Sequence, residues 1–125
     1  MSRNRLNPLD AAWVMTETRA TPNHVGALLT FTLPDDAPRD YLRSMMHEFR
    51  HDVGFTAPWN RRLKSAFNLS PLAEWVEDDD IDLEYHVRHT AVPAPGDREQ
   101  LRALASRQLS HRLDMKRPLW EMWLI

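Results

Sequence analysis

The chain has 125 residues, which is the size of one ordinary domain at most. It carries 16 basic and 18 acidic residues, so charge gives no reason to expect binding to nucleic acid or to an anionic membrane surface. The absence of cysteine excludes disulfides, thiolate metal sites and thiol nucleophiles. With neither a signal-peptide pattern nor an apolar run long enough to span a membrane, the sequence predicts a cytoplasmic protein.

The first elements are predicted to be a short helix and a strand. Asn7 followed by Pro8 is typical of an N-cap and a first helical residue. The side chains expected to face the core are Leu9, Trp13 and either Val14 or Met15. After the break at TPNH, residues 24–33 are rich in strand-forming residues, which predicts a fairly buried strand.

A second helix and a long loop are predicted next. Asp36 or Ala37 could cap the helix, with Pro38 in its first turn. Its apolar stripe would be Leu42, Met45, Met46, Phe49 and Val53. Residues 54–70 have no clean period and are interpreted as mostly loop. That loop holds the basic residues Arg61, Arg62 and Lys64, which could hold a phosphate but are more typical of a solvated loop.

The last part of the chain predicts a strand, a helix and a final strand. Residues 83–88 alternate, with Leu83, Tyr85 and Val87 on an apolar face and Glu84, His86 and Arg88 on a wet face. Asp97 sits at a cap position before a helix over 98–113. The final strand, 119–125, is almost entirely apolar. This order of helices and strands predicts a mixed α/β layer structure.

The segment HEFRH, residues 47–51, matches the H-E-x-x-H pattern that places two zinc ligands on one helix face. However, His47 and His51 fall opposite the apolar stripe of the helix, where a surface helix carries polar residues. Arg50 places a cation beside the metal position, and a third histidine is missing, since Ala57 stands in its place. We therefore interpret the segment as a solvated helix face and predict no metal site.

Two other groups of chemically able residues are interpreted as structural. The acidic run Glu77, Asp78, Asp79 and Asp80 lacks the spaced ligands and the glycine of a calcium loop, and resembles a solvated turn. The remaining histidines, which have no neighbouring serine or cysteine typical of a nucleophile site, are His24, His86, His89 and His111.

Several segments, taken in order, resemble a known family. They are LNPLDAAWVMTET, TPNHVGALLTF and EYHVRHTAVPAPGDREQLRALASRQLSHRLDMKRPLWEMWLI. Together they are similar to the N-terminal part of the bacterial bifunctional wax ester synthase / diacylglycerol acyltransferase family. Pro118, Leu119 and Trp120 match the P-L-W motif of that family, and residues 38–75 match least well.

The resemblance implies a mixed sheet with flanking helices, as part of the N-terminal lobe of a fold like that of chloramphenicol acetyltransferase. It implies an O-acyltransferase that moves a fatty acyl group from acyl-CoA to a diacylglycerol or a long-chain alcohol. Acyl-CoA is a substrate here, so no cofactor is expected, and Arg61, Arg62 and Lys64 become candidates for contacts with the CoA phosphates. Peripheral association with a membrane or lipid droplet would suit such substrates.

The family's catalytic motif, H-H-x-x-x-D-G, does not occur in this sequence, which has no His-His and no Asp-Gly pair. Its second histidine would act as the general base on the acceptor hydroxyl. We therefore expect residues 1–125 to be an incomplete N-terminal lobe that ends just before this motif, needs the remainder of the enzyme and is inactive alone. The uncapped apolar strand 119–125 also predicts association with other chains.

Two other functions compete with the acyltransferase. A truncated homologue could serve as a non-catalytic lipid-binding or interaction module, using its five tryptophans as apolar surface. A zinc peptidase built on HEFRH is the least favoured of the three.

Overall fold

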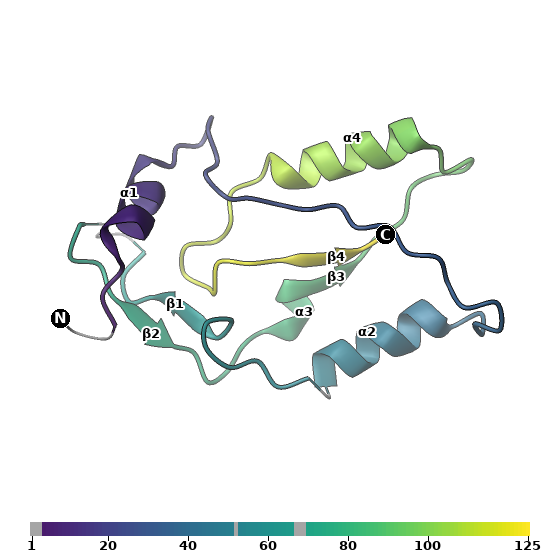
Figure 1. The fold of residues 1–125 in the computed structure, drawn as a ribbon, viewed down its shortest axis with the longest axis horizontal. Coiled ribbons are helices and arrows are strands. Elements are labelled where there is room, and N and C mark those ends of the chain that lie inside the picture. Colours follow the sequence, from purple (N-terminus) through teal and green to yellow (C-terminus); the bar gives the residue numbers. More distant parts are fainter. Residues whose placement is uncertain (1–3, 52, 67–69) are drawn as a thin grey trace. The chain divides into compact units, whose positions relative to one another are not determined.

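A computed structural model describes residues 4–51, 53–66 and 70–125 (Figure 1). The helices are α1 (Pro8–Thr16), α2 (Tyr41–His51), α3 (Leu83–His86) and α4 (Arg98–Leu109). The strands are β1 (Arg61–Leu63), β2 (Trp75–Glu77), β3 (Val87–His89) and β4 (Met122–Leu124). The combination of helices and short strands confirms the predicted mixed α/β class. None of the helices in the described ranges is long and apolar enough to cross a membrane.

The chain divides into two compact units, each made of three chain segments. Unit 1 contains Met1–His24, Phe55–Ile81 and Ser110–Trp120. Unit 2 contains Val25–Gly54, Asp82–Leu109 and Glu121–Ile125. Each unit holds one pair of strands: β1 with β2 in unit 1, and β3 with β4 in unit 2.

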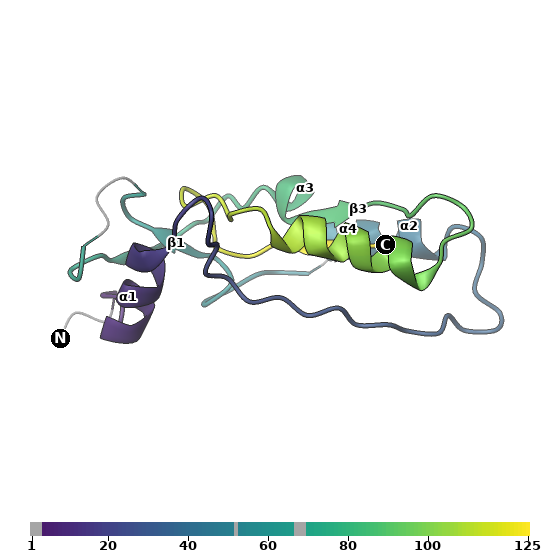
Figure 2. The same cartoon turned by 90° about the horizontal axis from the view of Figure 1, so that it is seen from above.

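Unit 1 packs α1 beside the antiparallel β1–β2 pair (Figure 1, Figure 2). The strands are in register with Arg61 opposite Glu77, Arg62 opposite Val76 and Leu63 opposite Trp75. The core of the unit consists of buried Leu6, Ala11, Val14 and Leu63, with Ala73, Trp75, Met115 and Leu119 packed against them. Three separate stretches of sequence therefore supply one small core.

The start of α1 is confirmed, but its predicted core face is partly wrong. Asn7 caps the helix, since its side-chain oxygen accepts a hydrogen bond of 2.8 Å from the backbone N–H of Asp10. Val14 is buried as expected, whereas Leu9 and Trp13 are exposed and Ala11 takes the inward position. The helix is apolar around most of its circumference, so the sequence could not identify which side faces the core.

Two strands of unit 1 were not predicted. The sequence predicts mostly loop over 54–70, where β1 lies, and a turn at the acidic run 77–80, where β2 ends at Glu77. Each has only three residues, which is too short to show a period of two. What defines them is their pairing with each other, which is a property of the tertiary structure.

Unit 2 joins α2 to the parallel β3–β4 pair. Val87 is opposite Met122, Arg88 opposite Trp123 and His89 opposite Leu124. The register continues past the strands, where the N–H of Thr90 donates to the carbonyl of Leu124 at 2.9 Å.

The second helix begins later than predicted. It starts at Tyr41 rather than near Asp36 to Pro38, because residues before it form turns closed by bonds to the carbonyls of Pro34 and Pro38. Met46 is the buried residue of its predicted apolar stripe.

The predicted strand at 24–33 is wrong, because no described residue pairs with it as a strand. Figure 1 shows this stretch as an extended segment without secondary structure. Its side chains are largely exposed, including Val25 (86%), Leu29 (70%) and Phe31 (84%). Strand-forming composition is not sufficient, since a strand exists only when another segment completes its hydrogen bonds.

The predicted strand 83–88 is also corrected. Its first half is the single-turn helix α3, capped by Asp82, whose side chain accepts from the N–H of Tyr85 at 3.1 Å. The strand begins only at Val87. The helical turn shifts the alternation, so His86, assigned to the wet face, is completely buried next to Val87.

The fourth helix confirms its predicted start. The N–H of Gln100 donates to the Asp97 carboxylate at 2.8 Å, and the Gln100 side chain accepts from the N–H of Asp97 at 3.0 Å. The helix ends at Leu109, before the predicted limit of 113.

Candidate functional site

The P-L-W segment lies in unit 1, just before strand β4 and not within it. Pro118 is buried, and Leu119 packs against the core formed with Leu6, Ala11, Val14 and Leu63. The predicted final strand, 119–125, is therefore shorter than expected, because it begins at Met122 and leaves Leu119 and Trp120 outside it. Both side chains are instead used in the packing of unit 1.

Trp120 is the centre of an aromatic cluster with Phe55 and Trp59. Its ring stacks on Phe55 with centroids 5.0 Å apart and meets Trp59 edge to face at 6.3 Å. The indole N–H donates a 2.7 Å hydrogen bond to the backbone carbonyl of Trp59. Trp120 is half-buried, and its polar and apolar parts both have defined contacts. The geometry is that of a packing anchor.

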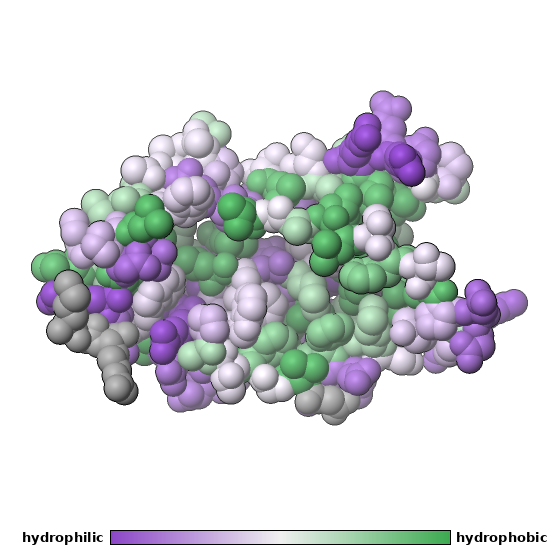
Figure 3. All heavy atoms as spheres, in the orientation of Figure 1, coloured by the Kyte–Doolittle hydropathy of each residue, from purple (hydrophilic) through white to green (hydrophobic). Residues whose placement is uncertain are grey.

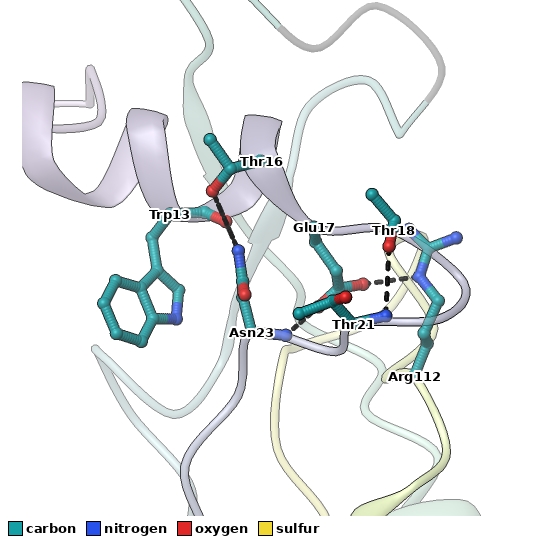
Figure 4. Close-up of polar contacts among 7 residues, drawn as sticks. All are labelled: Trp13, Thr16, Glu17, Thr18, Thr21, Asn23 and Arg112. Atoms are coloured by element: carbon teal, nitrogen blue, oxygen red, sulfur yellow. Dashed lines mark hydrogen bonds and ion pairs between the residues drawn. The ribbon is translucent and has the colours of Figure 1, made fainter.

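A polar network joins the end of α1 to the turn that follows it (Figure 4). The Asn23 side-chain amide donates to the carbonyl of Trp13 at 2.9 Å and to the hydroxyl of Thr16 at 2.8 Å. The backbone N–H of Asn23 donates to the Glu17 carboxylate at 3.2 Å. Groups left unpaired at the end of the helix are satisfied in this way by one asparagine.

Glu17 also forms an ion pair with Arg112, as Figure 4 shows. The Arg112 Nε lies 2.6 Å from Glu17 Oε1, and the Glu17 side chain is only 4% exposed. This pair ties the third segment of unit 1 to the first. Sequence reasoning missed it, because the partners are 95 residues apart and neither has a local signature.

Unit 2 has its own network around Arg88. The guanidinium lies over the Tyr85 ring at 4.3 Å and over the Trp123 ring at 5.1 Å, and its Nε donates to the Tyr85 carbonyl at 2.6 Å. Glu121 accepts from the Tyr85 hydroxyl at 3.0 Å and from the Trp123 indole at 3.2 Å. These side-chain contacts add to the backbone pairing that joins β4 to β3. The parallel pairing sets Arg88 opposite Trp123 and so brings the two local pairs, Tyr85 with Arg88 and Glu121 with Trp123, together.

The basic residues proposed for the CoA phosphates each face a carboxylate. Arg61 lies 3.8 Å from Glu77, Arg62 lies 3.3 Å from Asp78, and Lys64 lies 2.7 Å from Glu74. The hydrogen bond from Lys64 lowers the pKa of Glu74, and the positive charge of Lys64 adds to this effect. A phosphate would have to compete with these carboxylates, so the assignment to CoA stays a prediction.

The HEFRH segment forms the end of α2, and its interpretation as a solvated face is confirmed for both histidines. His47 and His51 are exposed, with ring centroids 4.4 Å apart. Arg50 has a structural role: its Nε and Nη2 donate to the Val87 carbonyl at 3.0 Å and 2.6 Å. This residue fastens α2 to β3 within unit 2.

The acidic run and the other histidines are dispersed. Glu77 and Asp78 take part in the ion pairs of β1, while the N–H of Asp80 bonds the Asp78 carboxylate at 3.2 Å. His89 and His111 are exposed, and His24 is half-buried. Among the residues that the structure describes, no three His, Asp or Glu side chains lie close enough together to hold a metal ion.

Comparisons with known proteins agree on one family. A sequence model of the wax ester synthase/diacylglycerol acyltransferase catalytic domain matches residues 6–125. A Mycobacterium tuberculosis protein named as a diacylglycerol O-acyltransferase is 43% identical over 122 residues, which is 97% of this chain and 24% of that protein. The O-acyltransferase WSD of Acinetobacter baylyi is 34% identical over 92% of this chain and 24% of its own length.

A solved structure gives the same result. The wax ester synthase/diacylglycerol acyltransferase from Marinobacter aquaeolei is similar with a TM-score of 0.88 and 40% identity, over 98% of this chain and 29% of that one. The chain thus spans about a quarter of the length of the relatives it matches. It belongs to the wax ester synthase/diacylglycerol acyltransferase family and corresponds to part of the catalytic domain.

Proposed function

We propose that this chain is the N-terminal portion of an O-acyltransferase that transfers a fatty acyl group from acyl-CoA to a diacylglycerol or a long-chain alcohol. The observation that carries the proposal is the match of residues 6–125 to the family's catalytic domain. The names of its relatives, which include diacylglycerol O-acyltransferases and a wax ester synthase, support both kinds of acceptor.

The chain would contribute framework and not the general base. Attack of an acceptor hydroxyl on a thioester needs a base placed to take the proton. The family resemblance assigns that role to a H-H-x-x-x-D-G histidine, and the sequence contains no such motif. His47 and His51 are exposed on α2, and His86 is buried. None of these three histidines belongs to a motif that resembles the family's general-base motif. We therefore propose that the isolated chain is inactive and acts together with the remainder of an acyltransferase.

The test compares the isolated chain with a chimera in which it replaces the matching region of the Marinobacter aquaeolei enzyme. Both are given radiolabelled acyl-CoA with a long-chain alcohol or a diacylglycerol, and ester formation is measured. We expect product from the chimera and none from the isolated chain. Turnover by the isolated chain would refute the incomplete-lobe proposal, and a folded but inactive chimera would count against the function itself.

The same chimera tests the proposed CoA contacts. If Arg61, Arg62 and Lys64 bind phosphate, replacing them with glutamine should raise the KM for acyl-CoA while kcat changes little. An unchanged KM would leave them only as partners of Glu77, Asp78 and Glu74. Flotation of the chimera with lipid vesicles would test the further proposal that a cytoplasmic enzyme of this kind associates peripherally with lipid surfaces.

A further inference from the structure

Residues 25–33 of unit 2, which we term the open segment, have the composition of a central strand without the pairing of one. Alternate positions carry Val25, Ala27, Leu29, Phe31 and Leu33. Those with the greatest exposure are Val25, Leu29 and Phe31, all on the same side of an extended chain. Figure 3 shows hydrophobic side chains gathered over this part of unit 2, between α4 and α2. Apolar surface of this kind marks an interaction site more often than a solvated loop.

The backbone of the open segment also lacks the hydrogen bonds of a paired strand, among the residues that the structure describes. None of the backbone hydrogen bonds found among the described residues involves residues 25–33. Natural edge strands are protected by lysine, proline or inward charges, and residues 25–33 contain no ionisable side chain and no proline. The segment therefore has the properties of a strand that is paired in its working state.

The start of the open segment passes close to the end of α4 within unit 2. A Cβ atom on Gly26 would collide with the side chain of Leu109, at the end of α4. Glycine lets the backbone pass this close without displacing the Leu109 side chain. The segment therefore starts beside α4, while Val25, Leu29 and Phe31 stay exposed.

The similarity to the longer Marinobacter aquaeolei structure indicates what the partner is. This chain has a TM-score of 0.88 to a stretch that makes up only 29% of that protein, so the matching stretch there belongs to a much longer polypeptide. We propose that the open segment is a docking strand for the remainder of the acyltransferase, which adds a strand to it by backbone pairing and covers Val25, Leu29 and Phe31. This inference rests on the proposed function and names the surface through which the remainder binds.

Hydrogen exchange followed by mass spectrometry tests the docking strand. The exchange of amides 25–33 is compared between the isolated chain and the Marinobacter chimera. We expect fast exchange in the isolated chain and exchange slower by at least about tenfold in the chimera, as for paired backbone. Fast exchange of these amides in a folded chimera would overturn the proposal. Slow exchange in an isolated chain that light scattering shows to be a dimer would also overturn it, because the occupant would then be a second copy.

Two variants at Phe31 test whether slow amide exchange depends on burial of this side chain. Phe31→Asp should abolish the slow exchange in the chimera while leaving the thermal midpoint of the isolated chain unchanged, since that side chain is exposed there. Phe31→Leu keeps an apolar group and should preserve the protection. Equal protection in all three chimeras would refute burial of this face. If the chimera does not fold by circular dichroism, the corresponding amides of the intact Marinobacter enzyme give the decisive measurement, and fast exchange there refutes the proposal.

Acyl transfer by the same chimera is measured separately. Activity with unprotected 25–33 amides would refute the docking strand and leave the proposed function standing. Protection without activity would support the docking strand and count against the function.

Discussion

The two units differ in whether an apolar segment of the chain is left outside their core. Unit 1 buries Leu6, Ala11, Val14 and Leu63 in one cluster and pairs its charges across β1 and β2. Unit 2 buries Met46, His86 and Val87 but leaves the open segment exposed, including Phe31 at 84%. A region with its own buried cluster differs here from one that leaves a whole apolar segment outside its core. Composition would not separate them, since both have many leucines and several aromatic residues.

The largest expected effect comes from comparing a buried residue in unit 1 with an exposed residue in unit 2. Leu63→Ala should lower the free energy of unfolding of the isolated chain by about 2 to 5 kcal/mol, because Leu63 is completely enclosed. Phe31→Ala should change it by less than about 0.5 kcal/mol, although phenylalanine is the larger side chain. Urea denaturation measures both, and similar losses for the two variants would contradict the contrast.

Trp120 sharpens the comparison because it lies at the last position of unit 1. Trp120→Ala should cost about 3 kcal/mol, since it removes the stack on Phe55 and leaves the Trp59 carbonyl without its indole donor. Trp120→Phe keeps a ring but loses the N–H, and should cost about 1 kcal/mol. Denaturation of both variants checks this order. In the chimera, an altered acyl-length preference with an unchanged melting temperature would instead identify Trp120 as a residue that lines the acyl tunnel.

Substitutions at Arg50 test how strongly α2 is held to β3 within unit 2. Arg50→Met keeps much of the aliphatic stem but loses both hydrogen bonds to the Val87 carbonyl, and should cost about 2 kcal/mol. His47→Ala and His51→Ala, on the same helix, are matched controls and should change stability by less than about 0.5 kcal/mol. Denaturation midpoints and the zinc content of the purified variants are measured together. Stoichiometric zinc lost in His51→Ala would reverse the assignment of this face.

The smallest expected effect is the pH dependence of the β1–β2 pair in unit 1. The pKa of Glu74 is lowered in the folded chain by the hydrogen bond and charge of Lys64, so its contribution to stability is present at neutral pH. That contribution is lost as the pH falls from the ordinary pKa of glutamate, about 4.3, through the lower folded value. In Lys64→Met the Glu74 carboxylate should titrate nearer its ordinary pKa. NMR titration of the side chain detects the change, and identical titrations in both proteins would exclude this pairing.

Local signals predicted the parts of the fold that depend on neighbours in sequence. Asn7 and Asp97 cap their helices as expected, because a cap involves residues only three positions apart. The exposed face of α2 was also predicted from the spacing of its apolar residues.

The failures depend on partners that the local pattern cannot show. β1 and β2 exist because they pair with each other, and residues 24–33 form no strand because no described residue pairs with them. The P-L-W motif was located by resemblance, yet the contacts of Trp120 with Phe55 and Trp59 come from a segment more than 60 positions away. The Glu17–Arg112 pair has the same origin. Sequence patterns thus indicated the family, but they did not predict which residues contact one another in the site.

The interleaving of the two units bears on how the protein can be made. The chain passes between them after residues 24, 54, 81, 109 and 120, so each unit draws on early, middle and late sequence. During translation, unit 1 cannot complete its core until Met115 and Leu119 have emerged from the ribosome, and unit 2 cannot form β4 until Met122–Leu124 has followed. Neither can fold ahead of the other as an N-terminal domain ordinarily does. Val25, Leu29 and Phe31 therefore leave the ribosome well before either unit can be completed.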